Sequence, residues 1–383
     1  MITQEYFADV FKQHFCCVIR HFQLKSLFQG WLALRTGDQG VHVLRKAIKA
    51  LVVASAAIFG ASLMTGCSGS NEQATNPTEI TVYSGRSEEF IAPFFAEWEQ
   101  SSGIKLNIRY GDSAELAAQI LEEGSNSPAD LFLSQDAGSL GAIARENLFI
   151  ELPANVAANI PAEYVAANRN WVGVTGRARV FAYNPNLLKV LPTSVTDLTN
   201  PLYKGKLGIA PINASFQAFV TALINAQGED FAEKWLKGLK ANDVRIYAKN
   251  SAIVEAIDKN EIAIGLVNHY YIWEVSEGLG REINVKNGFF KSGDLGNMIN
   301  VSGAGVLASS KKYAAAQDLI NFLTSQKIQE EFVSQTHEYS LLSGATAPAG
   351  LPLMSEIGAP SVDLDALKNI QITQDLLVKV GLL

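Results

Sequence analysis

The sequence predicts an α/β protein in which two strand-and-helix units are joined by a hinge and enclose a cleft. Three observations predict this fold. Expected strands and helices alternate along the chain, as in right-handed parallel α/β units. Several expected strands end in polar loops that contain glycine, such as Ser84-Gly85-Arg86. The chain beyond residue 67, about 315 residues long, is large enough to bury two cores. A hinged clamp of this kind would bind its ligand in the cleft.

The first unit begins with a strand from Glu79 to Tyr83, in which apolar and polar residues alternate. A helix follows, for which Ser87 is the expected cap, Phe90 to Trp98 supply an apolar stripe, and Gly103 is the end. Further strands are expected at 104–110 and 129–133. Further helices are expected at 113–124, capped by Ser113, and from about residue 139 to 147.

A connector over residues 164–179 leads into the second unit. Strands are expected there at 179–183, 207–210, 244–247 and in the apolar run 262–267, with helices at 215–226 and 230–241. A further strand is expected at 298–307, and helices at 313–324, 327–334 and 370–380 complete the chain. We therefore assign 79–178 with 303–350 to an N-terminal lobe, and 179–302 with 351–383 to a C-terminal lobe.

We expect the first 78 residues to lie outside the folded domain and to serve targeting and linking. Residues 43–67 have a basic start, a short apolar stretch and the lipobox-like end Leu63-Met64-Thr65-Gly66-Cys67, which predicts a lipoprotein signal peptide with Cys67 as the lipidated residue. An uncleaved anchor is the alternative. Residues 1–42 are unusual for a signal peptide, and we interpret them as an extension that arises if Val41 or Val43 is the true initiator. Residues 68–78 have the composition of a flexible linker.

Charge and cysteine content exclude several classes of function. Removing the seven basic and three acidic residues of the segment 1–67 from totals of 31 and 38 leaves 24 and 35, a net charge of −11. This balance argues against nucleic acid and against a basic membrane-binding patch. Cysteine is absent after Cys67, which excludes disulfides, thiolate metal sites and cysteine nucleophiles in the exported domain.

The strongest candidate for a functional site is the pair Tyr270 and Tyr271, which follows the apolar run 262–267. Open α/β sheets bind ligands beyond the carboxyl ends of their strands. A phenolate is a hard anionic oxygen donor, and two of them together favour a highly charged hard cation, above all ferric iron. Simple packing of the two rings is the alternative.

Several motifs, taken together, resemble those of the periplasmic ferric-ion-binding proteins of ABC iron importers. The resemblance runs from about Ile80 to the C-terminus. It is carried by Val82-Tyr83-Ser84-Gly85-Arg86, 126–132, Gly176-Arg177-Ala178-Arg179-Val180, 235–240, 247–251, Asn268-His269-Tyr270-Tyr271 and His337-Glu338-Tyr339-Ser340-Leu341. The resemblance implies a type II substrate-binding fold with two lobes and no enzymatic activity.

The resemblance also implies a ligand set. The family's adjacent iron ligands fall on Tyr270 and Tyr271. Its anion-binding residues fall on Asn250 and Asn268 and on the helix start at Asn213-Ala214-Ser215, where backbone N–H groups can hold an anion. This sequence departs from the family where a ligand His is replaced by Ser87 and a ligand Glu by Gln135, which is followed by Asp136. Branches with extra tyrosines have them where Glu88 stands and near Phe216.

A captured anion completes the expected site. Fe³⁺ with two phenolates keeps one positive charge, which is costly to bury without a partner. The resemblance implies carbonate or phosphate, and Arg86 is placed to bind it through its planar guanidinium. An interlobe ion pair is the alternative role of Arg86. Gln135, Asp136 and Glu88 are possible cleft contacts, although Asp136 also fits a helix cap. We expect His269 to point away from the cleft.

Three functions follow in order of preference. The first is an exported, lipid-anchored, monomeric protein that binds Fe(III) and delivers it to an ABC permease and its ATPase. The second keeps the clamp but binds a small organic ligand such as a phosphonate, thiamine or a polyamine. The third is an enzyme, which is disfavoured because the sequence contains no G-x-S-x-G, Walker or G-x-G-x-x-G motif in a suitable place.

Overall fold

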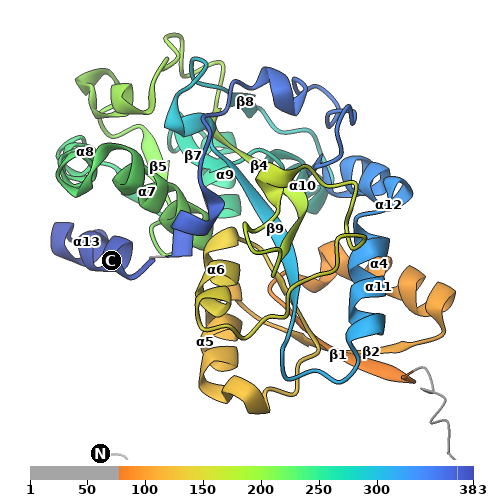
Figure 1. The fold of residues 1–383 in the computed structure, drawn as a ribbon. Coiled ribbons are helices and arrows are strands. Elements are labelled where there is room, and N and C mark those ends of the chain that lie inside the picture. The colour runs from red at the N-terminus through yellow and green to blue at the C-terminus, as the bar shows by residue number, and fades with distance from the viewer. Residues whose placement is uncertain (1–76, 369) are drawn as a thin grey trace, which may run out of the picture. The chain divides into compact units, whose positions relative to one another are not determined.

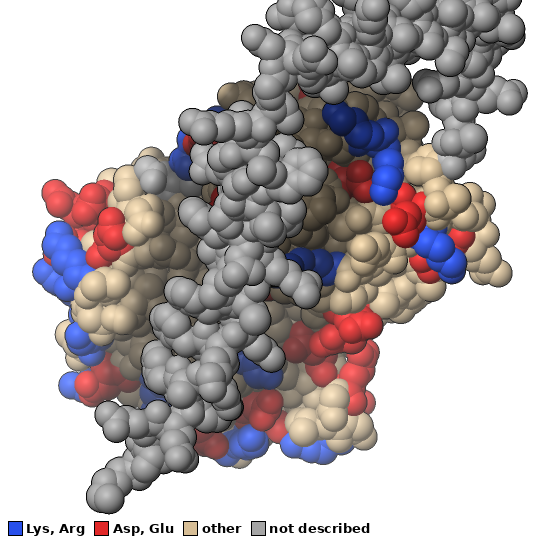
Figure 2. Space-filling model, turned by 90° about the horizontal axis from the view of Figure 1, so that it is seen from below, with Lys and Arg blue, Asp and Glu red and all other residues tan. Residues whose placement is uncertain are grey.

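The computed structural model describes residues 77–368 and 370–383. The expected extension 1–42, the signal segment 43–67 with Cys67, and the linker up to residue 76 lie outside these residues. Within the described residues, no helix combines the length and apolar character that crossing a membrane requires. On the face drawn in Figure 2, acidic and basic side chains are interspersed.

The first lobe is built on a sheet whose strands β1 (Glu79–Ser84), β2 (Lys105–Tyr110) and β3 (Leu131–Ser134) run parallel, in the order β2-β1-β3. Helices α4 (Glu88–Ser102), α5 (Ser113–Glu123) and α6 (Ala137–Arg145) connect and cover them (Figure 1). The expected apolar stripe of α4 is confirmed, because Ile91, Phe94, Phe95 and Trp98 are its buried residues.

Two long strands, which we call the hinge strands, pass from the first lobe to the second. They are β4 (Val172–Tyr183) and β9 (Ile299–Val306), which pair antiparallel. The part of β4 from Val172 to Ala178 pairs with β9, and the part from Arg179 onward pairs with β7 (Ile264–Asn268). The connector expected at 164–179 is therefore wrong for residues 172–178. Every residue from Val172 to Ala182 is buried, so the alternation that marks a half-exposed strand is missing.

The second lobe contains the parallel strands β5 (Leu207–Ile209), β6 (Arg245–Ile246) and β7, with β8 (Lys286–Gly288) paired to β4. Its helices are α7 (Ala214–Gln227), α8 (Glu229–Ala241), α9 (Asn250–Asp258) and α10 (Tyr271–Leu279). Helix α13 (Ile370–Val380) packs on α7 and α8 (Figure 1). The sequence did not predict α10, because Tyr-Tyr-Ile-Trp-Glu has no helix-start signal.

The last part of the chain returns to the first lobe before α13. Helices α11 (Tyr313–Leu323) and α12 (Gln326–Glu331) lead, through a π-helical turn at Phe332–Thr336, to β10 (Tyr339–Ser340), which pairs with β4. Helix α11 packs on β9 and α4. The helix expected at 327–334 therefore changes to a wider turn before its expected end.

Two expected caps differ in the structure. Ser87 occupies the N-cap position of α4, but its side chain makes no capping hydrogen bond. Helix α5 is capped by Asp112, which accepts the N–H of Ala114 at 2.8 Å. Ser113 is instead the first helical residue, and its hydroxyl accepts the N–H of Gln135 at 2.9 Å. An Asp at the N-cap serves the helix at least as well as Ser, which frees Ser113 to join two strand-end loops.

Candidate functional site

The two tyrosines lie where the second lobe meets the first. Tyr270 stands at the N-cap position of α10 and Tyr271 is its first residue, directly beyond β7. Their rings stack with centroids 4.5 Å apart and planes inclined by 29°. Tyr270 also packs edge-on against Phe90 of α4, with centroids 5.8 Å apart. Both phenols therefore come from one helix start, whose positive end favours an anionic oxygen.

Tyr271 is held as a neutral phenol in the structure. Burial raises its pKa well above the usual value, the neighbouring Tyr270 and Glu274 raise it further, and the Asn250 side chain opposes the rise through a hydrogen bond. A bound cation acts in the opposite direction, because it stabilises the phenolate directly. Loading a trivalent metal at this point would therefore release protons.

A polar network surrounds the tyrosines on the second-lobe side. The Asn268 amide donates to the Ser215 hydroxyl at 3.1 Å and accepts a hydrogen bond from Arg179 Nη1 at 3.1 Å. The Asn213 side chain caps α7 by accepting the Ser215 N–H at 3.1 Å, and it also accepts from Asn250 Nδ2 at 3.2 Å. The structure thus brings together four of the five residues for which the sequence predicted anion binding, with Arg179 beside them.

Arg86 approaches the tyrosines from the first lobe. It is 4% exposed, and its Nη2 lies 2.9 Å from Oε2 of Glu338, which is fully buried. The Arg86 side chain also hydrogen-bonds Tyr270 and lies over the Phe90 ring, 5.1 Å from its centroid. Arg86 therefore lies beside the predicted metal ligands, and it forms a buried ion pair, although both partners belong to the first lobe rather than to different lobes as the alternative expected.

Arg177 lies beside the same carboxylate as Arg86. We call Arg86, Arg177, Arg179 and Glu338 the charged floor of the cleft. Arg177 is fully buried, and its Nε lies 3.9 Å from Oε1 of Glu338. Within the described part of the chain, its three guanidinium nitrogens have no hydrogen-bond partner, and neither does Nη2 of Arg179 or Oδ1 of Asn250. Buried polar groups in proteins are nearly always hydrogen-bonded. The unpaired nitrogens of Arg177 and Arg179 form a donor set that fits an anion with several acceptor oxygens, whereas Oδ1 of Asn250 is an acceptor.

Each of the three possible cleft contacts has a different setting in the structure. Gln135 is tied through its backbone N–H to Ser113. Asp136 is buried and caps α6, accepting the N–H of Ser139 at 2.8 Å, as one of its two expected roles requires. Burial raises the pKa of Asp136, and the hydrogen bond from the Ser139 backbone lowers it. Glu88 is exposed in the first turn of α4.

His269 fixes the turn that carries the tyrosines. It is fully buried, its Nδ1 accepts the N–H of Ala178 at 3.1 Å, and its Nε2 donates to the carbonyl of His337 at 2.7 Å. Burial lowers its pKa to about 4, so the ring is neutral at ordinary pH. Because both ring nitrogens are used by the backbone, His269 connects the tyrosine turn to a hinge strand, as its expected orientation away from the cleft requires.

Glu338 is the residue of the site to which the sequence had assigned no role. The only available signal was a charged residue between His337 and Tyr339 in one of the motifs that carry the resemblance. Its partner Arg86 is 252 positions away, so no local pattern reveals the pair. Within residues 77–368 and 370–383, no group of three or more His, Cys, Asp or Glu side chains is arranged to hold a metal ion.

A two-lobed α/β clamp, with its strand ends and helix starts facing a polar cleft, defines a substrate-binding protein of the type II fold. Residues 126–368 match the family described as bacterial extracellular solute-binding protein, and the chain belongs to this family. The iron-bound HitA of Pseudomonas aeruginosa superposes with a TM-score of 0.75 at 33% identity, covering 80% of this chain and 100% of HitA.

Curated relatives agree with this assignment. The Fe(3+)-binding periplasmic protein of Serratia marcescens is 33% identical over 308 residues, which is 79% of this chain and 90% of that protein. The major ferric iron-binding protein of Neisseria meningitidis is 33% identical over 312 residues, 79% of this chain and 93% of that protein. The expected family, fold and non-enzymatic character are confirmed, since these relatives are solute-binding transport proteins.

Proposed function

We propose that this protein captures Fe(III) between its lobes and delivers it to an ABC importer. The observation that carries the proposal is the stacked pair Tyr270 and Tyr271 at the lobe junction, where phenol oxygens converge beside buried guanidinium groups. Hard anionic oxygens suit a hard trivalent ion. The names and bound ligand of the ferric relatives support the choice of cargo.

A carbonate or phosphate ion would bind together with the metal. Two phenolates neutralise two of the three charges of Fe(III), and burial of the remaining charge favours a captured anion. Arg86 would bind this anion from the first lobe. From the second lobe, Asn250, Asn268 and the α7 start at Asn213 and Ser215 would supply further donors.

Lobe closure would trap the cargo. Ligands on the second lobe and an anion held by both lobes stabilise the closed arrangement over the open one. We propose the lobe boundaries predicted from the sequence, 79–178 with 303–350 and 179–302 with 351–383. Cys67 would anchor the exported protein to a membrane by lipidation, which would leave the domain free to dock on a permease that works with its ATPase.

Iron loading followed by absorption spectroscopy tests the proposal. Wild-type protein loaded with ferric citrate and bicarbonate should show a visible tyrosinate-to-iron charge-transfer band. Tyr270→Phe and Tyr271→Phe should each shift or weaken the band and lower the iron affinity by at least tenfold. Tyr183→Phe, on β4 outside the cleft network, is the matched control and should leave both unchanged. A colourless loaded wild type, or unchanged binding in both cleft variants, would refute the proposal.

The identity of the anion requires a separate experiment. Apo protein is loaded with iron in buffers that contain only bicarbonate or only phosphate, each titrated over a wide range. Arg86→Lys should weaken the dependence on a planar oxyanion most, because an ammonium group lacks the bidentate fork. Iron binding that is independent of both anions would remove the anion from the proposal but leave the tyrosinate ligation standing.

A further inference from the structure

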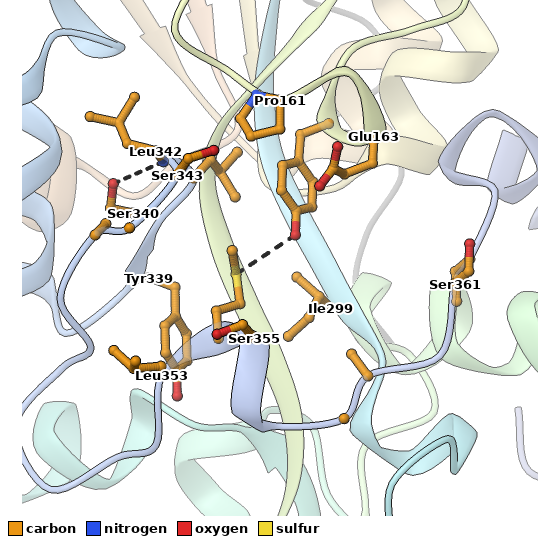
Figure 3. A pocket seen from close by; sticks show the side chains of 18 of the residues that line it. Pro161, Glu163, Ile299, Tyr339, Ser340, Leu342, Ser343, Leu353, Ser355 and Ser361 are labelled. Carbon is orange, nitrogen blue, oxygen red and sulfur yellow. Dashed lines mark hydrogen bonds between the residues drawn. The ribbon is translucent and has the colours of Figure 1, made fainter.

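A cavity of about 630 Å³ lies behind the hinge strands, on the side away from the tyrosines. Figure 3 shows Pro161 and Glu163 on one side of it, and Tyr339, Leu353 and Ser355 on another. The hydroxyl of Tyr164 reaches across to the sulfur of Met354 at 3.9 Å. The volume is within the range of about 300–1,000 Å³ in which proteins bind small molecules.

Strand alternation connects this cavity to the charged floor of the cleft. Successive residues of a strand point to opposite faces of the sheet. Three neighbouring strands each direct one residue to the floor and the adjacent residue to the cavity or its walls. These pairs are Arg177 and Gly176 on β4, Asn300 and Ile299 on β9, and Glu338 with Tyr339 at β10. A Cβ atom at Gly176 would lie 3.0 Å from Leu341 and 3.2 Å from Met354.

The walls of the cavity are fastened to different lobes. On the first-lobe side, the hydroxyl of Ser340 and the N–H of Leu341 both donate to Oε1 of Gln329 on α12 at 3.0 Å. On the second-lobe side, the carbonyl of Gly358 accepts the N–H of Gly293 at 2.7 Å. Rotation of the lobes about the hinge strands would therefore shift one wall relative to the other, against the hydrogen bond that the Tyr339 hydroxyl donates to the carbonyl of Pro352 at 3.0 Å.

The direction of this coupling follows from the cleft side. Phe90 of the first lobe packs on Tyr270 of the second, so the lobes are in contact in front of the hinge. Opening the cleft would separate these residues and bring the walls behind the hinge together. With the hinge strands as the pivot, the cavity would be larger when the cleft is closed, and a molecule that fills it would stabilise the closed arrangement.

The lining indicates the chemistry of such a molecule. Among the residues that line the cavity, all in the described part of the chain, Glu163 carries the only charge, and no Lys, Arg or His is present. A bare anion would therefore have no positively charged side chain to pair with in this cavity. Aromatic and aliphatic side chains form most of the remaining wall. Four hydroxyls of the lining belong to exposed residues, where a ligand in the cavity can reach them: those of Ser343, Thr346, Ser355 and Ser361.

We propose that this cavity is an effector site for a small uncharged molecule with hydroxyl groups on an apolar body, and that its occupation increases retention of the cargo in the cleft. The effect on iron rests on the proposed function, whereas binding in the cavity does not. Couplings between sites in one protein are typically 5–150-fold in affinity. We expect the lower part of that range, because a small ligand spans only one side of the hinge.

Filling the cavity with a side chain tests the coupling. Ala359→Trp and Ser343→Trp place bulk on opposite walls, and Ala226→Trp on the exposed end of α7 is the matched control. Iron affinity is measured by competition with citrate, and lobe opening by small-angle scattering of the apo proteins. Both cavity variants should be more compact and should bind iron about fivefold more tightly. Affinities equal to the control within about twofold, or lowered, would overturn the coupling.

Direct ligand binding tests the site without iron. trans-1,2-Cyclohexanediol is the probe and cyclohexanecarboxylate its charged counterpart, both followed by ligand-observed NMR on the wild-type domain. The diol should show saturable binding that either tryptophan variant abolishes and Ala226→Trp retains. Absence of diol binding, its persistence in both cavity variants, or equal binding of the carboxylate would each refute the site. If Tyr270→Phe and Tyr271→Phe bound iron as tightly as the wild type, only the proposed cargo would be refuted.

Discussion

Replacing Glu338 with Gln should destabilise the protein strongly although the shape of the side chain is kept. Glu338 is fully buried, lies 2.9 Å from Arg86 and 3.9 Å from Arg177, and is the carboxylate that these two guanidinium groups share. Gln can still accept a hydrogen bond from Arg86 but supplies no charge. Removing one partner of a buried ion pair costs about 3–5 kcal/mol. We expect the lower end of this range, because one hydrogen bond is preserved.

The melting temperature provides the assay. A loss of about 3 kcal/mol lowers the Tm of a domain of this size by about 5 °C. The variant leaves two uncompensated cations in the cleft, so an oxyanion should stabilise it more than it stabilises the wild type. An anion at one hundred times its dissociation constant adds about 2.7 kcal/mol. Calorimetry of the apo proteins with and without phosphate measures both effects.

The matched control is Glu277→Gln, which removes the same charge from a side chain that is 67% exposed. Its contact with His337, at 3.2 Å, lies at the surface and is worth at most about 1 kcal/mol. The reasoning is refuted if Glu338→Gln melts within about 2 °C of the control. It is also refuted if phosphate stabilises the variant no more than the wild type.

Three further predictions follow from single contacts. In the apo protein, His269 has a pKa of about 4 against 6.5 when unfolded, so the unfolding free energy should fall by about 3 kcal/mol as pH drops through this window. Urea titrations at several pH values should show this slope, and His269→Gln should remove it. Asn268→Ala leaves the Arg179 guanidinium without its hydrogen bond and should cost about 1–3 kcal/mol in the same assay. Asp112→Ala removes the cap of α5 and should cost about 1 kcal/mol, whereas Ser87→Ala, which removes no cap bond, should be neutral.

The sequence predicted elements with an amphipathic pattern, and it also predicted the strands β3, β7 and β9, which are buried throughout. The apolar stripe of α4 is confirmed, and the alternation of β1 holds from Glu79 to Val82, beyond which Tyr83 and Ser84 are both buried. Periodicity gave no signal for residues 172–178, because that stretch of β4 is buried on both faces. Helix α10 was missed because it begins with two aromatic residues that serve the cleft rather than with a capping residue.

The candidate site likewise contains residues that the sequence predicted and residues that it did not. The tyrosine pair is adjacent in the chain, so its chemistry is visible in the sequence. The carboxylate that pairs with Arg86 cannot be identified from the sequence. Glu338 lies 252 positions away and reaches Arg86 only through the pairing of β10 with β4. The hydrogen bonds of Asn268 to Ser215 and Arg179 likewise depend on the packing of three separate elements. Pairings between distant strands have no local pattern from which they can be predicted.

The charge of the cleft floor predicts the order in which the cargo binds. Arg86 and Arg179 both act electrostatically on the two tyrosines, and Arg177 lies beside Arg179. Glu338 is the carboxylate paired with Arg86 and Arg177, and Arg179 has no such partner among the described residues. A bare trivalent cation would be repelled by this floor, whereas an oxyanion would be attracted. The anion should therefore bind first and create the negative oxygens that admit the metal. In stopped-flow loading, the rate of colour formation should rise with bicarbonate or phosphate and then saturate. Glu338→Gln should saturate at a lower anion concentration, because its floor is more positive. A loading rate that is independent of the anion, or a variant that needs more of it, would refute this order.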